Sequence, residues 1–286
     1  MASRPLLERI RSLCDGPLVL IKGAEVAALY PERARSFSDL DILCPDANAV
    51  HAALLAGGFV EVDDPEVYTV DQHHLRPLQW PGIWLWVEVH LRPLWPRELR
   101  PPSMDDIVSS AVPSATGVAG ISAPAPAHHA VILASHSWVT MPLGNLRDLV
   151  DVAAVAAQTD EATLAAAARQ WGVDRLWRTT YKAASGLLGG GDRTVAVRVW
   201  ARHLPGVREY NVLDNHLKRW LNGLWGLPPR LALRSIAVVF RQELFPYPDE
   251  SWRDKFIRVR NAFTKPRAPM SVHTRAWQKS RSRRSS

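Results

Sequence analysis

Two aspartates separated by a single leucine are the residues of this chain best suited to chemistry. Asp39 and Asp41 lie in the segment SFSDLDILCP, whose apolar residues and closing proline are typical of a short strand. Side chains two residues apart in a strand point to the same face, so the two carboxylates would project side by side. Two carboxylates this close repel each other unless a cation or solvent lies between them. Carboxylate oxygens at this spacing suit Mg²⁺, although an aspartate pair taken alone is more often a solvated strand face.

A lysine and a glycine come before this aspartate pair. The run PLVLIKG predicts a buried strand that ends at Lys22 and Gly23, and AEVAALY predicts a short helix directly after it. Glycine at such a junction lets a phosphate approach backbone amides at a helix start, where the helix dipole favours anions. Lys22 would add a positive charge. An ordinary turn glycine is an equally good interpretation of Gly23.

A third acidic residue occurs in the later segment WLWVEVH. Glu88 and His90 would share one face of a strand, with valines on the other face. If this strand lies beside the strand of the two aspartates, Glu88 would bind a metal there or take a proton from an attacking hydroxyl. The alternative is an exposed glutamate on an edge strand. His90 is expected to be structural or to face the substrate, because Mg²⁺ prefers oxygen ligands, and Trp84 or Trp86 could stack on a base.

Other polar side chains have weaker patterns. His129 and His136 are seven residues apart on one helical face, but no carboxylate joins them at ligand spacing, so packing is expected. Arg147 and Asp151 are four residues apart on a predicted helix and could form an ion pair there.

The elements that must position these residues change character along the chain. Residues 1–100 alternate helical and strand-like segments, which predicts an α/β (α+β) catalytic domain with a mixed sheet flanked by helices. Residues 101–126 are rich in Pro, Ser, Gly and Ala and are predicted to be a linker. Residues 127–262 have apolar spacing that predicts an all-helical, acceptor-binding domain, and residues 263–286 are predicted to be a disordered basic tail. Strands are expected at 17–23, 36–45, 59–63, 67–71 and 83–91, and helices of the first part at 6–14, 24–30 and 47–58.

Composition narrows the class of protein. The apolar share of 47% and charged share of 22% are ordinary for a soluble globular protein, and we expect no membrane span and no signal peptide. The two cysteines have no metal-ligand spacing, which favours a reducing cytoplasm. The net charge of +7 equals the seven positive charges of residues 265–286, so residues 1–264 sum to zero and a nucleic-acid partner is not favoured.

The ordered series of motifs resembles the polymerase-β-like nucleotidyltransferase superfamily. The series is Lys-Gly, a short helix ending in tyrosine, an arginine, Ser-Asp-Leu-Asp-Ile-Leu, a helix ending in Gly-Gly-Phe, and Val-Glu-Val-His-Leu. It is similar in particular to a bacterial group of uncharacterised nucleotidyltransferases in which Lys-Gly replaces the usual Gly-Gly or Gly-Ser. The resemblance covers residues 17–92 and continues more weakly through His136 and residues 146–151.

The resemblance implies roles for these motifs. The implied catalytic and metal-binding residues are Asp39, Asp41 and Glu88, and the implied nucleotide-binding residues are Lys22, Gly23, Arg35 and Ser38. The implied reaction moves a nucleoside monophosphate, by default AMP, from an NTP to a hydroxyl or phosphate, with Mg²⁺ or Mn²⁺ as cofactor and pyrophosphate as leaving group. The acceptor would be a small molecule, a peptide or a protein. Two alternatives stay open, namely a toxin that modifies an RNA such as a tRNA end, and a catalytically inactive nucleotide-binding module.

Overall fold

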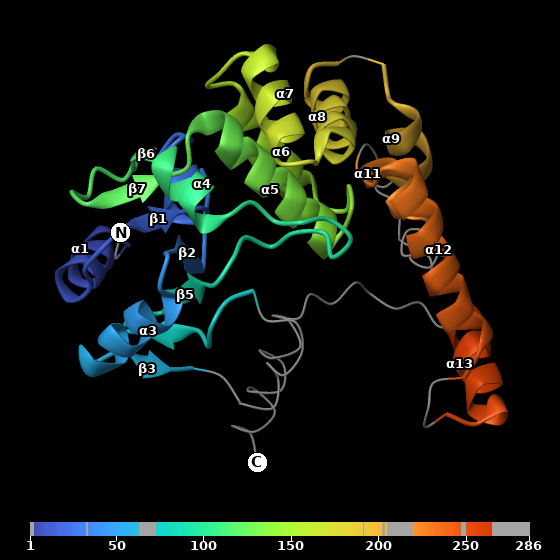
Figure 1. The fold of residues 1–286 in the computed structure, drawn as a ribbon, viewed down its shortest axis with the longest axis horizontal. Helices are drawn as coiled ribbons and strands as arrows, with labels where there is room; N and C mark the ends of the chain where they lie inside the picture. Colours follow the sequence, from blue (N-terminus) through green and yellow to red (C-terminus); the bar gives the residue numbers. More distant parts are fainter. Residues whose placement is uncertain are drawn as a thin grey trace. The chain divides into compact units, whose positions relative to one another are not determined.

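The structure, a computed structural model, falls into two compact units that are described separately (Figure 1). The units are Met1–Thr194 and Val195–Ser286. The expected strand at 67–71 and the basic tail from residue 265 onward lie outside the described residues. The described residues are 3–32, 34–62, 73–190, 192–201, 204, 220–246 and 250–264.

A mixed sheet forms the centre of the first unit. Within the described residues it has seven strands in the order β3-β4-β5-β2-β1-β7-β6. The strands β2 and β5 run parallel to each other, and β1 is antiparallel to β2 and parallel to β7. The strand bounds are β1 Leu18–Leu20, β2 Asp39–Leu43, β3 Val60–Glu61, β4 Leu78–Gln79, β5 Trp86–His90, β6 Val112–Pro113 and β7 Ile121–Ala123.

One face of this sheet packs against the helices α1 (Ser3–Leu13) and α3 (Ala47–Ala56). The apolar core there contains Leu40 and Ile42 of β2 and Val87 and Val89 of β5, together with leucine and isoleucine side chains of α1. Because side chains alternate along a strand, the acidic residues between these apolar ones face the opposite side of the sheet. The two-residue periodicity of the sequence therefore predicted the faces of β2 and β5 correctly.

A helical layer completes the first unit and contains the helices α5 to α8 (Figure 1). The helix α5 packs against α6, α7 and α8, and ten of its fifteen residues are buried. The imidazole of His129 on α5 forms a hydrogen bond of 2.7 Å with the carbonyl oxygen of Ile21, at the end of β1, so this helix is attached directly to the sheet. The helix bounds are α5 Pro126–Thr140, α6 Leu146–Ala156, α7 Glu161–Gln170 and α8 Asp174–Leu188.

The segment 101–126, expected to be a linker, is part of this first unit. It contains the helix α4 (Met104–Ser109) and the strands β6 and β7, and β7 pairs with β1 inside the sheet. Its glycines serve the turn between these strands, since Gly117 and Gly120 have φ values of 70° and 77°. The boundary between the compact units falls instead after Thr194, so the expected helical domain of residues 127–262 is divided between them.

The second unit is helical in its described part. Its helices are α9 (Val195–Trp200), α11 (Gly223–Gly226), α12 (Pro229–Leu244) and α13 (Trp252–Thr264). Residues 195–286 contain 19 Lys and Arg against 6 Asp and Glu, whereas residues 1–194 contain 16 against 22. The zero net charge of residues 1–264 therefore combines a negative first unit with a positive second one. None of the described helices is both long and apolar enough to cross a bilayer.

The junction between β1 and the short helix α2 (Ala24–Ala27) depends on a glycine. Gly23 has a φ of +56°, and a Cβ atom there would lie 2.3 Å from the carbonyl oxygen of Asp39. We predict that Gly23→Ala lowers the free energy of unfolding by more than the roughly 1–2 kcal/mol that a left-handed conformation costs alanine, because the backbone of β2 must also move. Urea denaturation followed by circular dichroism measures the loss.

Gly82→Ala is the matched control for this substitution. Gly82 has a φ of +85°, but a Cβ atom there would meet no atom within 4 Å. Gly82→Ala should therefore lower the free energy of unfolding only by the cost of placing alanine in this backbone conformation. Equal losses in the two variants would contradict the close approach of Gly23 to Asp39.

Candidate metal and nucleotide site

Asp41 and Glu88 lie side by side on the central strands of the sheet. The parallel register of β2 and β5 makes them direct partners, and their exposed fractions are only 2% and 5%. The strand β5 lies between β4 and β2 in the sheet order. Glu88 is therefore not an exposed residue of an edge strand, and it lies beside the strand of the two aspartates.

Asp39 lies at the start of β2, where it is half-buried and opposite Trp86. Its charge acts on both Lys22 and Glu88. Among the residues that the structure describes, however, the group whose potential ligand atoms all lie within 4.8 Å of one another is Asp41, Glu88 and His90. The structure thus brings together two of the three predicted metal ligands and adds a histidine to them.

His90 is buried against both carboxyl groups. Its Nε2 lies 3.1 Å from Oδ1 of Asp41 and 3.7 Å from Oε2 of Glu88. The sequence analysis placed His90 on the correct face but expected a structural or substrate-facing residue. Its proximity to both carboxyl groups depends on the pairing of β2 with β5, which no local pattern specifies.

Two further histidines adjoin this site and were missed in the sequence. The rings of His73 and His74 lie 5.2 Å and 5.3 Å from the ring of His90, and Nε2 of His74 is 3.9 Å from Oε2 of Glu88. His74 pairs with His90 through an isolated antiparallel bridge. The adjacent histidine pair was the available signal, but its position beside Glu88 arises from tertiary structure.

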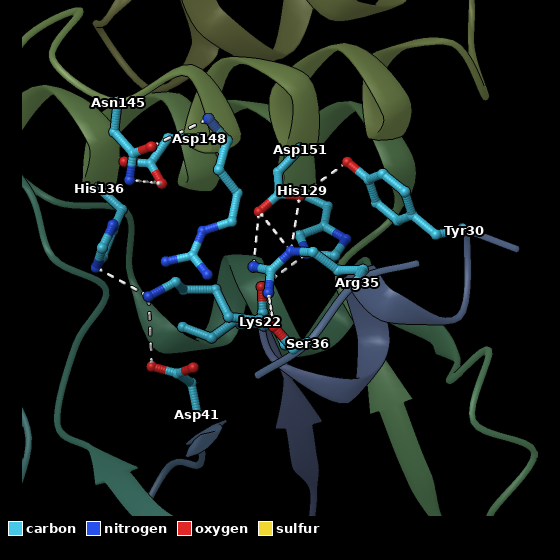
Figure 2. Close-up of polar contacts among 12 residues, drawn as sticks. Lys22, Tyr30, Arg35, Ser36, Asp41, His129, His136, Asn145, Asp148 and Asp151 are labelled. Atoms are coloured by element: carbon cyan, nitrogen blue, oxygen red, sulfur yellow. Dashed lines mark hydrogen bonds and ion pairs between the residues drawn. The ribbon is translucent and has the colours of Figure 1, made fainter. Parts of the chain in front are cut away.

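Lys22 supplies the positive charge next to Asp41 (Figure 2). Its Nζ lies 3.9 Å from Oδ1 of Asp41 and 3.0 Å from Nε2 of His136 on α5. Burial opposes the charge of Lys22, but Asp41, Asp39 and Glu88 raise its pKa above the ordinary value. Burial and then Lys22 lower the pKa of His136 well below its usual range, so a neutral imidazole accepts the hydrogen bond from the ammonium group.

The two carboxyl groups differ in protonation. Burial opposes ionisation of Asp41, but Lys22 and the hydrogen bond from His90 outweigh it and hold the pKa of Asp41 below its usual range. Burial, followed by the charges of Asp41 and Asp39, raises the pKa of Glu88 to about 8. At neutral pH the pair therefore carries one charge on Asp41 and a proton on Glu88.

The donor set fits a divalent cation. Oδ2 of Asp41 and Oε1 of Glu88 are buried and have no hydrogen-bond partner within the described part of the chain. Buried polar atoms normally have a partner, because leaving one unsatisfied costs about 1–3 kcal/mol. Potential ligand atoms of Asp41, Glu88 and His90 lie within 4.8 Å of one another, so these residues could hold a metal ion.

Arg35 is held by a residue of the helix α6 (Figure 2). Its Nε and Nη2 lie 3.0 Å and 2.8 Å from the carboxylate of Asp151, and the hydroxyl of Tyr30 donates to the same carboxylate at 2.8 Å. Asp151 therefore forms an ion pair with Arg35, whereas the sequence had suggested Arg147 as a possible local partner. This contact joins the segment before β2 to the helical layer.

The other predicted nucleotide-binding residues lie near the same strands. The close approach of Gly23 to Asp39 explains why this position is a glycine without any contact to a phosphate. Ser38 is exposed directly before β2, and its carbonyl oxygen accepts a hydrogen bond of 3.0 Å from the amide of Trp86. The contacts of Lys22, Gly23, Arg35 and Ser38 with a nucleotide stay predictions.

A mixed sheet with an acidic centre and flanking helices is the class of structure that the sequence predicted for a nucleotidyltransferase. The chain belongs to the family described as uncharacterised nucleotidyltransferases, whose family model matches residues 7–189. The matched residues include β2, β5, Lys22 and Asp151 and end close to the boundary of the first unit. The predicted family and fold class are therefore confirmed. No curated protein and no solved structure matches the chain.

Glu88 should make the stability of the metal-free protein depend on pH. Its pKa in the folded state is raised to about 8, so the folded protein binds more protons than the unfolded chain between about pH 4.3 and that value. The contribution of Glu88 to the free energy of unfolding should therefore fall as the pH rises through this window. Glu88→Gln removes the ionisation, so the variant should gain stability relative to the wild type. Urea unfolding in EDTA from about pH 5 to about pH 9 measures this difference, and parallel pH profiles would contradict it.

Asp151 should be important for stability through Arg35. We predict that Asp151→Ala costs about 3–5 kcal/mol of unfolding free energy, because it leaves the largely buried guanidinium of Arg35 unpaired. Tyr30→Phe removes one hydrogen bond to the same carboxylate and should cost only about 1–2 kcal/mol. Chemical denaturation of both variants measures the difference. A loss for Asp151→Ala no larger than that for Tyr30→Phe would show that the ion pair is not formed in solution.

Proposed function

We propose that the protein is a metal-dependent nucleotidyltransferase. It transfers a nucleoside monophosphate, AMP by default, from an NTP to a hydroxyl or phosphate of a small-molecule, peptide or protein acceptor and releases pyrophosphate. The observation that carries this proposal is the buried pairing of Asp41 with Glu88 on parallel strands, where each has an oxygen without a partner among the described residues. Membership of a nucleotidyltransferase family supports the reaction class.

The proposed roles follow from charge and position. Asp41 and Glu88, with Asp39 at the rim, would hold a divalent ion, which when bound offsets the negative charge of the transferred phosphoryl group. Lys22 is charged and lies on the same face, so it would bind a phosphate oxygen of the NTP. The raised pKa of Glu88 lies close to neutral pH, which suits a residue that takes a proton from the acceptor hydroxyl once it has lost its own.

The base of the nucleotide has a candidate contact next to this site. Trp84 is 86% exposed and lies two residues before the start of the strand that carries Glu88. An exposed aromatic ring of this size can stack on a nucleobase, and such stacking contributes about 1–3 kcal/mol for each base. Trp84 is therefore our candidate for base stacking, while the default choice of ATP rests on no particular side chain.

A second candidate function, transfer to an RNA such as a tRNA end, is favoured by the charge of the second unit. Residues 195–286 carry 19 Lys and Arg against 6 Asp and Glu, and Arg230, Arg234 and Arg241 are exposed on α12. Clustered arginines attract phosphate backbones without reading sequence. The acceptor class therefore has to be decided by experiment.

The deciding experiment labels acceptors in a cell extract. The protein is incubated with extract, labelled NTP and Mg²⁺ or Mn²⁺, and mass spectrometry with gel analysis identifies what gains a nucleotide. We predict that Asp41→Asn lowers product formation at least about a hundredfold, because the ion loses a charged ligand. Asp105→Asn is the matched control, because Asp105 is an exposed carboxylate on α4.

The outcomes separate the three candidate functions. Labelled small molecules or proteins support the main proposal, and labelled RNA supports the second candidate. Binding of NTP without turnover in any fraction would contradict both and leave an inactive nucleotide-binding module. Equal activity in Asp41→Asn and Asp105→Asn would contradict the assigned site.

A further inference from the structure

We propose that His90 is a nitrogen ligand of the metal at this site, and that the site therefore prefers a first-row transition ion such as Mn²⁺ over Mg²⁺. The inference rests on the proposed function only for the expectation that a metal acts here. It changes the expected ligand set from three carboxylates to two carboxylates and an imidazole, with Asp39 outside the closest group.

The distances between the three side chains fit a shared ion. Nε2 of His90 is 3.1 Å from Oδ1 of Asp41 and 3.7 Å from Oε2 of Glu88. Two ligand atoms bonded at about 2.1 Å to one ion lie about 3.0 Å apart at right angles and about 3.4 Å apart at a tetrahedral angle. The two observed separations from Nε2 match these values to a few tenths of an ångström, and the ligand atoms of all three residues lie within 4.8 Å of one another.

A purely structural role for His90 leaves part of the site unexplained. The hydrogen bond from His90 satisfies only Oδ1 of Asp41. Oδ2 of Asp41 and Oε1 of Glu88 are still without a partner among the side chains that the structure describes, although the three residues are only 2%, 5% and 2% exposed. Buried oxygens of this kind normally have a partner, so the contact with His90 does not account for all the polar atoms of the site.

The neighbouring charges permit a cation at this position. Lys22 is a positive group next to the site, and its Nζ lies 3.9 Å from Oδ1 of Asp41 while it donates to His136 at 3.0 Å. An ion bound here would lie next to the carboxyl groups of Asp41 and Glu88 as well as next to Lys22.

The imidazole determines which ions the site prefers. Mg²⁺ binds oxygen ligands and gives up its water reluctantly, so an imidazole contributes little to its affinity. First-row transition ions accept imidazole nitrogen readily, and two carboxylates with one histidine leave coordination positions open for water or a phosphate oxygen. A site with this donor set should bind Mn²⁺ more tightly than Mg²⁺, and the preference should depend on His90.

The test is direct metal binding to the nucleotide-free full-length protein. Mn²⁺ is added to protein labelled with nitrogen-15 histidine, and electron spin echo spectroscopy detects coupling between the ion and a histidine nitrogen. We expect the coupling in the wild type and its loss in His90→Gln. The same substitution should weaken Mn²⁺ binding at least about tenfold and Mg²⁺ binding by less than about twofold, as measured by titration calorimetry.

Glutamine is chosen because it separates a ligand from a positioning residue. Its amide nitrogen lies close to the place of Nε2 and can still donate to Asp41, so a residue that only orients Asp41 would be rescued in both measurements. His74→Gln is the matched control, because His74 also faces Glu88 but lies outside the closest group. It should keep the coupling and the preference for Mn²⁺.

Several outcomes would overturn the assignment of His90. Absence of histidine coupling in the wild type does so without any variant, and so does coupling that persists in His90→Gln or disappears only in His74→Gln. If His90→Gln fails to fold by circular dichroism, His90→Asn takes its place. Because no nucleotide is present, a protein that shows the coupling but never transfers a nucleotide would refute the proposed function and leave this inference standing. Transfer activity without the coupling would do the reverse.

Discussion

The parallel pairing of β2 with β5 is the constraint on which the rest of the first unit depends. It buries Asp41 directly beside Glu88 in the middle of the sheet, where two ionised carboxylates would repel each other strongly. The surrounding side chains compensate for this arrangement. Lys22 and His90 keep Asp41 ionised, and Glu88 holds its proton at neutral pH. Repulsion between the two groups is therefore reduced, but Oδ2 of Asp41 and Oε1 of Glu88 have no hydrogen-bond partner among the described residues.

The helix α5, which belongs to the helical layer, contacts the end of β1 and the side chain of Lys22. His129 and His136 are two turns apart on α5, and they contact the consecutive residues Ile21 and Lys22 at the end of β1. Arg35 and Asp151 make a second connection between the segment before β2 and the helix α6. The family match and the first unit both include this helical layer as well as the sheet.

Local patterns predicted the strands but not the contacts between them. The alternation of polar and apolar residues located β2 and β5 and assigned their faces, because a strand's side chains alternate whatever its neighbours are. Asp41, Glu88 and His90 come together because β2 pairs with β5, and the paired residues Asp41 and Glu88 are 47 positions apart in the sequence. The sequence did not predict this pairing and gave it only as the condition under which Glu88 would reach the metal. The pair of Arg35 with Asp151 joins residues 116 apart, and the local partner Arg147 was the more obvious choice. Residues 101–126 were predicted to be a linker from their Pro, Gly and Ser content, and the structure has α4, β6 and β7 there, because these residues are also frequent in turns between short strands.

The distribution of charge makes a bound ion more important than the sequence alone suggested. Residues 1–264 have no net charge, but residues 1–194, which contain the site, have six more acidic than basic side chains. An NTP is itself strongly negative, so the average field of this unit repels it, and attraction must come from charges close to the phosphates. Lys22 has its Nζ 3.9 Å from Oδ1 of Asp41, and Arg35 is paired with Asp151. A single lysine does not offset a triphosphate together with an ionised Asp41, so a divalent ion between Asp41 and Glu88 would have to supply most of the local positive charge.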